Sequence, residues 1–351
     1  MKRKLAAGLA VACAATLGIS NPAAASIDPL FGYDVSWPQC SVTLPLDGAF
    51  KIIGVNNGLP FSENPCLQQQ LSWAGATAQL YINTANPGPE LSSFWPIGQK
   101  SPKSCIASDP DSSGCAFNYG YNFAKDSVAR AELAFQSLGY GDPKQNFIWL
   151  DVETENSWRN SSAKNVEVLK GALSYLKSIG VRRIGFYSNS YQWGEITGGT
   201  TIFSDYPAWE ATASNALLSI ERCSTRVGFT GGRLRLAQYI DPELNLDVNV
   251  DCLNSPKLQT ELENRSASEV NRSTKISLKA KLVAETGNPV KNQKITFRYR
   301  GKNYSVKTNN KGIAKIEVLS PSKKGEYSFR IRLEGATYFL DNSVTADLLV
   351  R

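Results

Sequence analysis

Phe147-Ile-Trp-Leu-Asp-Val-Glu153 is a short apolar run that ends in two acidic residues. Before it, residues 122–138 repeat apolar side chains at helical spacing, and residues 165–179 do so after it. Gly180 follows the second pattern directly, as is typical of the residue that ends a helix. The stretch therefore predicts a strand between two helices, which is the repeating unit of an α/β fold with a parallel sheet.

The same alternation continues on both sides of this unit. Short apolar runs bounded by turn residues predict further strands, and another helical pattern lies between two of them. The runs are residues 31–36, 50–55, 78–82, 183–188, 208–211 and 234–240, and the helix is predicted at 67–74. We expect residues 26–254 to form one domain around a parallel sheet, either open or closed. Residues 85–119 interrupt the pattern with many Pro, Ser, Gly and Asp residues and predict a long functional loop.

The last part of the chain changes to period two. Apolar and polar residues alternate in short runs separated by turn residues, which predicts a small all-β sandwich over 273–351 after a polar linker at 255–272. Residues 272–351 hold 17 Lys and Arg against 6 Asp and Glu, a net charge of +11. Residues 26–271 hold 18 against 25, a net charge of −7. Opposite charges on two domains indicate different partners.

The N-terminus predicts export. Three basic residues at 2–4 precede an apolar stretch that ends near residue 19, and small residues follow up to Ala25. This pattern is typical of a signal peptide over 1–25, and the apolar stretch is too short for a convincing membrane span. It predicts a secreted or cell-wall protein after cleavage. A lipoprotein signal at Cys13 is the alternative interpretation.

Six cysteines remain after such a cleavage, and an even number in an exported chain indicates disulfide bonds. Six cysteines allow fifteen pairings. Our prediction joins nearest neighbours along the chain, as Cys40–Cys66, Cys105–Cys115 and Cys223–Cys252. A zinc site is the weaker alternative, because the sequence has no CxxC pair. The chain also has no histidine, so acid–base chemistry falls to Asp, Glu, Tyr or Lys.

Asp151 and Glu153 are the first candidates for that chemistry. Residues two apart in a strand project from the same face, with Cα atoms about 6.5–7 Å apart. In a closed barrel, active sites are built at the C-terminal ends of the strands. Like charges held close together raise the pKa of one carboxyl, so it can act as an acid beside an ionised neighbour, as glycoside cleavage requires. Asp34 ends the first predicted strand and would lie at the same end.

Each of these residues also has an ordinary interpretation. A strand-end Asp-x-Glu is common by chance, and it can cap the next helix or face solvent. Asp34 can form an Asx-turn with Ser36, which the Asp-x-Ser sequence favours. These three residues alone do not identify a catalytic site.

Six short motifs follow one another in the order and rough spacing of a known family. They are Gly32-Tyr-Asp-Val-Ser-Trp-Pro-Gln39, Leu150-Asp-Val-Glu153, Phe186-Tyr-Ser188, Pro207-Ala-Trp-Glu-Ala211, Ala237-Gln-Tyr239 and Leu246-Asp-Val-Asn249. Together they resemble glycoside hydrolase family 25 lysozymes over residues 31–254. The resemblance implies a TIM-like (β/α) barrel whose last strands lack helices. It also implies an N-acetylmuramidase, which hydrolyses the β-1,4 bond between N-acetylmuramic acid and N-acetylglucosamine in peptidoglycan.

The resemblance further implies roles for individual residues. Glu153 would be the general acid, and Asp151 would orient the substrate acetamido group or stabilise positive charge at the sugar. Asp34 and Asp247 would complete the acidic cluster, with Asp251 as a competitor for Asp247. The residues that would line the groove are Tyr81, Tyr187, Trp209, Gln238 and Tyr239. Ordinary packing is the alternative interpretation for each of the aromatic residues.

Three departures from the family pattern keep other functions open. Ile82-Asn83-Thr84 follows Tyr81 where the family usually has a His, Ala237 replaces a Trp, and the loop at 85–119 is an addition. The alternatives are a non-catalytic cell-wall carbohydrate-binding protein on the same barrel and a glycosidase that acts on another polysaccharide.

Near the C-terminus, Gly335-Ala-Thr-Tyr338 and Asn342-Ser343 resemble the last-strand pattern of bacterial immunoglobulin-like domains. The charge of +11 favours anionic wall polymers or a membrane surface as partners, to the same degree as it favours a plain soluble spacer. Nucleic acid is not expected as a partner of an exported protein. Phosphate-binding glycine loops and metal-ligand spacings are absent from the sequence, so we expect no metal or cofactor. We expect a monomer.

Overall fold

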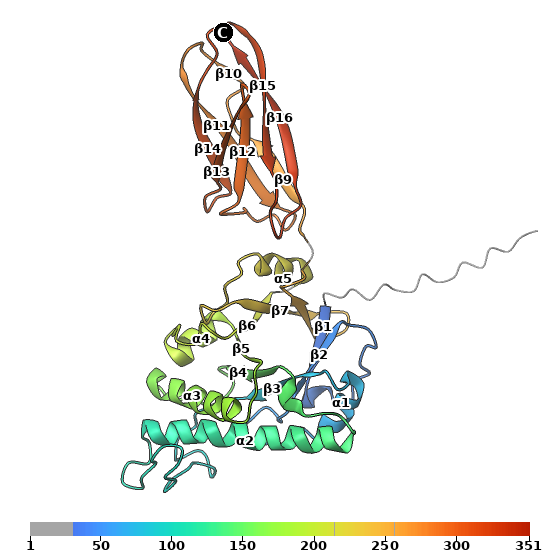
Figure 1. Cartoon of the computed structure of the whole chain (residues 1–351), viewed down its shortest axis with the longest axis vertical. Coiled ribbons are helices and arrows are strands. Elements are labelled where there is room, and N and C mark those ends of the chain that lie inside the picture. Colours follow the sequence, from blue (N-terminus) through green and yellow to red (C-terminus); the bar gives the residue numbers. More distant parts are fainter. Residues whose placement is uncertain (1–30, 214, 256) are drawn as a thin grey trace, which may run out of the picture.

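The computed structural model describes residues 31–213, 215–255 and 257–351, and its first part is a closed barrel (Figure 1). Neighbouring strands from β1 to β7 are parallel, whereas β8 is antiparallel to both β7 and β1 and closes the barrel. The expected parallel sheet is therefore closed, and its last strand comes from a segment with no predicted strand. The strands are β1 (Phe31–Val35), β2 (Phe50–Gly54), β3 (Gln79–Asn83), β4 (Ile148–Asp151), β5 (Ile184–Ser188), β6 (Ala208–Ala213), β7 (Leu234–Asp241) and β8 (Leu246–Asp251).

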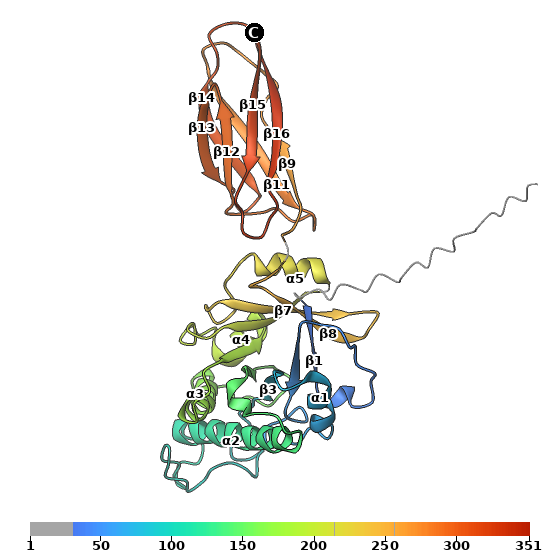
Figure 2. The same ribbon diagram turned by 45° about the vertical axis from the view of Figure 1, so that its right-hand side comes forward.

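Helices connect successive strands from β2 to β7. They are α1 (Leu67–Ala74), α2 (Ser113–Ser137), α3 (Ser162–Ser178), α4 (Ser190–Thr197) and α5 (Ala216–Cys223). The helices α2 and α3 lie side by side along one side of the barrel (Figure 2). The expectation that the last strands lack helices is correct only between β7 and β8, because α5 connects β6 to β7. Both α4 and α5 have 8 residues, too few to show a clear helical period in the sequence.

The helix α2 begins earlier than predicted. It starts at Ser113, and the Ser112 hydroxyl caps it by accepting a hydrogen bond from the backbone N–H of Cys115. The long loop expected at 85–119 therefore ends at residue 112. The first turn of α2 carries small and polar residues, which give no apolar period to recognise.

Large aromatic side chains fill the inside of the barrel. Trp149 on β4 and Trp209 on β6 are buried there, with ring centroids 5.7 Å apart. Gly185 on β5 makes room for Trp149, because a Cβ at this position would lie 2.3 Å from its ring. Gly54 on β2 makes room for Tyr81 in the same way, at 2.5 Å. The interior is therefore a packed core that supports the rim from below.

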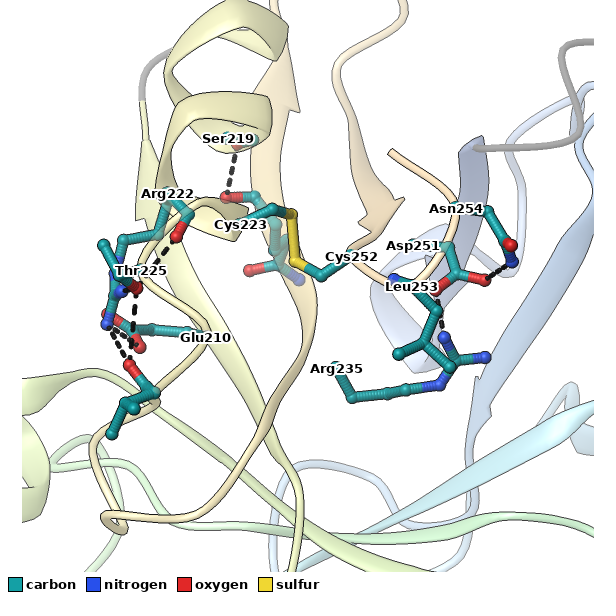
Figure 3. The surroundings of a disulfide bond; sticks show 12 residues. Glu210, Ser219, Arg222, Cys223, Thr225, Arg235, Asp251, Cys252, Leu253 and Asn254 are labelled. Atoms are coloured by element: carbon teal, nitrogen blue, oxygen red, sulfur yellow. Dashed lines mark hydrogen bonds and ion pairs between the residues drawn. A yellow bond between two sulfur atoms is a disulfide. The ribbon is translucent and has the colours of Figure 1, made fainter. Parts of the chain in front are cut away.

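The disulfides pair as predicted. Cys105–Cys115 ties the long loop to the first turn of α2. Cys223–Cys252 ties the end of α5 to the end of β8 (Figure 3). Cys40–Cys66 joins the segment after the short 3-10 helix Trp37–Gln39 to the start of α1.

The C-terminal residues form two sheets with a shared apolar core. One sheet has the order β10-β16-β15-β12-β13, and the other has the order β14-β11-β9. This all-β architecture agrees with the alternation in the sequence. The strands are β9 (Thr260–Asn264), β10 (Glu269–Val270), β11 (Lys275–Ala284), β12 (Lys294–Tyr299), β13 (Lys302–Lys307), β14 (Ile313–Leu319), β15 (Gly325–Leu333) and β16 (Asn342–Val350).

The segment expected to be a linker, residues 255–272, contributes two of these strands. β9 pairs with β11 through Leu262 and Leu282, and β10 pairs with β16. Leu262 is 7% exposed, so one buried leucine holds a mostly polar segment against the sheet. Strand structure of this kind depends on tertiary packing and leaves little pattern in the sequence.

The predicted signal peptide at 1–25, with Cys13, lies outside the described residues. Within the described ranges, no helix combines the length and apolar character that a membrane span requires.

The glycines inside the barrel generate a prediction. We expect Gly185→Ala to lower the free energy of unfolding by at least about 2 kcal/mol, because the new methyl group overpacks the core against Trp149. All seven tryptophans lie between residues 31 and 254, so tryptophan fluorescence during urea unfolding reports on the barrel alone.

Gly194 in α4 is the matched control, since a Cβ there meets nothing within 4 Å. Gly194→Ala should leave stability unchanged or raise it by up to about 1 kcal/mol. Equal effects of the two substitutions would contradict the packing described for the barrel interior.

Candidate active site

Four acidic side chains gather at one rim of the barrel. Asp34 lies near the end of β1, and Asp247 on β8 is its direct partner across the antiparallel pair. Asp151 ends β4, and Glu153 follows two residues later. Their charges act on one another, because Asp247 and Glu153 both raise the pKa of Asp34, and Glu153 raises the pKa of Asp151. The structure thus brings together the four residues predicted as catalytic.

Asp34 is buried, and two side-chain amides hold its carboxyl group. The Asn249 Nδ2 donates to Asp34 Oδ2 at 2.6 Å, and the Gln238 Nε2 donates to the same oxygen at 3.0 Å. Each amide is oriented in turn by an aromatic residue. Trp209 Nε1 donates to Asn249 Oδ1 at 2.6 Å, and the Tyr187 hydroxyl donates to Gln238 Oε1 at 2.7 Å. The direction of the Asp34 carboxyl is therefore fixed by a network that reaches into the barrel core.

Asp151 is held from the neighbouring strand. It is 2% exposed, and Asn83 at the end of β3 donates a hydrogen bond from Nδ2 to its Oδ2. The Thr84 hydroxyl donates to the Asp151 backbone carbonyl at 2.5 Å. These two contacts fix both the side chain and the backbone of Asp151 at the strand end.

Glu153 lies beyond the end of β4 and remains partly exposed. Its backbone carbonyl accepts a hydrogen bond from Trp158 Nε1 at 2.7 Å, which holds the segment after the strand in position. Of the two neighbouring carboxyls, Glu153 is the one that a substrate can reach, because Asp151 is covered.

Burial raises the pKa of all four carboxyls. Burial and the charges of Glu155 and Asp247 raise the pKa of Glu153 to about 7, although a hydrogen bond with Asp151 acts in the opposite direction. Burial raises the pKa of Asp247 to about 6. Asp34 and Asp151, which are more deeply buried, have pKa values well above the usual range, although their amide donors act in the opposite direction. The cluster therefore shares protons near neutral pH, and Glu153 is the accessible member that can donate one.

Two tyrosines of the predicted groove belong to this cluster. Burial raises the pKa of both Tyr81 and Tyr187, and the nearby carboxylates raise it further, so both phenols keep their protons. Tyr187 contacts the ring of Trp209 at a centroid distance of 4.4 Å. Trp209 itself is 2% exposed, so it lies beneath the rim and supports Tyr187 and Asn249 from below.

Tyr239 does not lie in this cluster. It follows Gln238 on β7, and successive residues of a strand point to opposite faces. Gln238 points inward to Asp34, so Tyr239 points outward. There, burial raises the pKa of Tyr239 to about 12, and the charges of Asp241 and Tyr33 add to the rise. The structure therefore does not bring Tyr239 to the acidic cluster, because adjacent residues of a strand point to opposite faces.

The structure also separates Asp247 from Asp251. Asp251 ends β8 and forms an ion pair with Arg235, as Figure 3 shows. It also accepts hydrogen bonds from the backbone N–H of Leu253 at 2.9 Å and from Asn254 at 2.9 Å. Asp251 thus stabilises the turn after β8, and Asp247 is the fourth member of the acidic cluster.

Several residues of the site were not predicted from the sequence. Asn83 and Asn249 are the amide donors to Asp151 and Asp34, Trp158 holds Glu153, and Glu155 raises its pKa. Asn249 is the last residue of the sixth family-like motif, and its place in that motif was the one indication of its role in the sequence. Glu155 lies two residues after Glu153, but its influence acts through space and has no sequence pattern.

The loop after β3 borders the site on one side. The backbone N–H of Asn86 donates to the Ser157 carbonyl at 2.8 Å, so the loop runs along the segment that follows Glu153. Arg159 joins the two segments through ion pairs with Asp111 at 2.7 Å and Glu90 at 3.3 Å. A cavity of about 360 Å³ lies between them, with Trp158 among its lining residues. Within the described ranges, no group of three or more His, Cys, Asp and Glu side chains is arranged to hold a metal ion.

Comparisons with known proteins agree with this chemistry. A family model described as Lysozyme-like protein 1 matches residues 121–224. The chain is similar to Probable GH family 25 lysozyme 4 of Dictyostelium discoideum, with 26% identity over 203 residues, which cover 58% of this chain and 89% of the relative. It is also similar to Probable GH family 25 lysozyme 5 of the same organism, with 33% identity over 72 residues, which cover 20% of this chain and 33% of that protein.

Among solved structures, a muramidase from Trichobolus zukalii matches 63% of this chain and 93% of its own, with 17% identity and a TM-score of 0.41. The family match and the sequence relatives support a lysozyme-like glycoside hydrolase.

The raised pKa of Glu153 generates a prediction about stability. The folded barrel holds a proton that the unfolded chain releases between about pH 4.5 and pH 7, so this stabilisation is present at low pH and is lost as the pH rises through 7. We expect the free energy of unfolding to fall over this interval by on the order of 2 kcal/mol. Glu153→Gln should remove much of the fall and make the barrel more stable than the wild type at pH 8.

The measurement is urea unfolding followed by tryptophan fluorescence at pH 4.5, 6, 7 and 8. Glu195→Gln, which changes an exposed glutamate on α4, is the control and should retain the wild-type pH dependence. A Glu153→Gln variant with the full wild-type fall would show that Glu153 does not carry the proton.

Proposed function

We propose that this protein is a secreted peptidoglycan glycosidase that hydrolyses the β-1,4 bond between N-acetylmuramic acid and N-acetylglucosamine. The observation that carries the proposal is the partly exposed Glu153, whose pKa is raised to about 7 beside three other carboxyls at the rim of a closed barrel. A carboxyl of this kind is protonated in a large fraction of molecules at neutral pH and can protonate a glycosidic oxygen.

In this proposal each member of the cluster has a distinct task. Glu153 donates its proton to the leaving oxygen, and Trp158 keeps its backbone in position. Asp151, held by Asn83, accepts a hydrogen bond from the substrate acetamido group or stabilises the positive charge that develops at the sugar. Asp247, with its pKa of about 6, supplies negative charge to the rim at neutral pH, which favours an oxocarbenium-like transition state over the neutral substrate, and Asp34 shares its proton with the cluster.

A non-catalytic wall-binding protein on the same barrel is the main alternative. Such a protein would bind sugars through aromatic and amide groups. Four carboxyls that lie close together and lose their hydration would destabilise it without adding to binding. The burial of these carboxyls with oriented amide donors favours the enzyme. A glycosidase for another polysaccharide differs only in the sugar that the rim accepts, and the product analysis below distinguishes it.

The proposal includes two further points about the whole chain. The predicted signal peptide would export the protein to the wall, where its substrate is found. The C-terminal module is proposed to be an immunoglobulin-like sandwich, which the two facing sheets support. Its basic charge would hold anionic polymers of the wall beside the barrel.

Digestion of purified peptidoglycan tests the activity. We expect muropeptides with N-acetylmuramic acid at the reducing end, detected by mass spectrometry after reduction. Glu153→Gln should lower the rate by at least about a hundredfold, because it removes the donated proton while keeping the size of the side chain. Products with another reducing sugar would show that the protein is a different glycosidase. A fully active Glu153→Gln variant would show that Glu153 is not the general acid.

The charge of Glu155 generates a second prediction. This exposed carboxylate raises the pKa of Glu153, so its removal should lower that pKa. We expect Glu155→Gln to shift the alkaline limb of the kcat/KM profile to lower pH, by a few tenths of a unit at low salt, with little loss of rate below pH 5. Glu195→Gln is again the control. An unchanged limb in Glu155→Gln would mean that another group sets it.

A further inference from the structure

The two sheets of the C-terminal module have different outer faces. On the five-stranded sheet, five cations project outward from three neighbouring strands, and we call them the basic sheet face. They are Lys294, Arg298, Lys307, Arg330 and Arg332. The alternate residues of these strands are apolar and point to the core between the sheets. Glu326 and Asp347 project from the same sheet beyond Arg330, so the five cations gather toward one end of a rigid face.

Like charges stand directly opposite one another on this face. Lys294 is the cross-strand partner of Lys307, and Arg298 is the partner of Arg330. Neighbouring strands are about 4.8 Å apart, and like charges at this spacing destabilise a sheet. Among the residues that the structure describes, no carboxylate lies within ion-pair distance of these four cations. Only Arg332 has such a partner, Glu334 at 2.9 Å.

The outer face of the three-stranded sheet also has two cations directly opposite each other, Lys279 and Lys315, but there an acidic residue pairs with one of them. Glu317 on β14 forms ion pairs with Lys315 at 2.8 Å and with Lys275 at 3.3 Å. These lysines and the Ser277 hydroxyl lower the pKa of Glu317 to about 2. On β9, Glu263 stands opposite Lys281. Solubility alone does not explain why opposed cations have a carboxylate within ion-pair distance on one face, whereas those on the other face have none among the described residues.

Protection of a sheet edge does not explain the array either. Lysines on an edge strand prevent pairing with other chains, and Lys307 on the edge strand β13 fits that role. Arg298 and Arg330 lie on β12 and β15, which are interior strands with neighbours on both sides. Their cross-strand repulsion costs stability without guarding any edge, so a bound anion is the remaining explanation.

Hydroxyl groups complete the face. Thr296 and Ser305 lie between the cation pairs, with their oxygens 3.0 Å apart, and Ser343 accepts a hydrogen bond from Arg330 at 3.0 Å. Arginine can bind a phosphate through two parallel hydrogen bonds, and hydroxyls add further donors. Arg330 and Arg332 are about 6.5–7 Å apart along β15, Lys294 and Arg298 are about twice as far apart along β12, and neighbouring strands are about 4.8 Å apart. An array with these spacings suits an extended chain of phosphates better than a single small ligand.

We propose that the basic sheet face binds a linear phosphodiester polymer attached to the cell wall, and that this binding holds the barrel at its substrate. The proposal extends the wall-directed function proposed above. The basic sheet face shares no residue with the acidic cluster, so an experiment can disprove polymer binding without disproving hydrolysis, and the reverse.

Binding of the full chain to purified poly(glycerol phosphate) tests the proposal. We expect measurable binding at low salt that weakens as salt increases, because phosphate contacts release counterions. Arg298→Gln/Arg330→Gln should weaken binding by about tenfold and reduce the salt dependence, since two phosphate contacts are lost. Hydrolysis of soluble peptidoglycan fragments by this variant should remain at the wild-type rate.

Lys279→Gln/Lys315→Gln is the matched control, because it also removes two opposed cations, but from the outer face of the three-stranded sheet. It should change the affinity less than twofold. Equal losses of affinity in both variants would show that only the net charge matters and would overturn the proposal. An absence of binding by the wild type would also overturn it. Tighter binding of single-stranded DNA of equal charge than of poly(glycerol phosphate) would overturn the assignment to a wall polymer.

Discussion

Burial of carboxyl groups at the rim of the barrel is the constraint on which the rest of this structure depends. Water would stabilise each of Asp34, Asp151, Glu153 and Asp247 as an anion, and the barrel withholds that water. The cluster compensates in part by keeping protons and in part by accepting hydrogen bonds from oriented amides. Proton donation by Glu153 near neutral pH is then a consequence of where the chain places it.

The barrel core makes this placement possible. Trp209 orients Asn249, and Tyr187, which packs on Trp209, orients Gln238. Trp149 and Tyr81 pack against Trp209, and both fit inside the barrel only because Gly185 and Gly54 leave space for them. The packing of the interior and the electrostatics of the rim are therefore one arrangement, in which the core fixes the groups that hold Asp34.

The sequence predicted those parts of the molecule that follow from regular alternation. Asp151 and Glu153 could be identified because they end an apolar run, and a barrel gathers strand ends at one rim. The same alternation places Tyr239 outside the acidic cluster, because Gln238 before it points inward to Asp34. The resemblance of motifs alone did not show on which face each residue lies. Asn83 and Glu155 act on the site through tertiary contacts. The strand β9 depends on one buried leucine, and the helices α4 and α5 are too short to show a helical period. None of these leaves a pattern that periodicity can detect.

Infrared spectroscopy of carboxyl groups shows directly whether Glu153 keeps its proton up to about pH 7. The carbonyl stretch of protonated carboxyl groups would be followed from pH 4 to pH 9, in the wild type and in Glu153→Gln. We expect one component of the band to be present in the wild type, absent from Glu153→Gln, and reduced to half its intensity near pH 7. Complete loss of the protonated carboxyl signal below pH 5 in the wild type would contradict it.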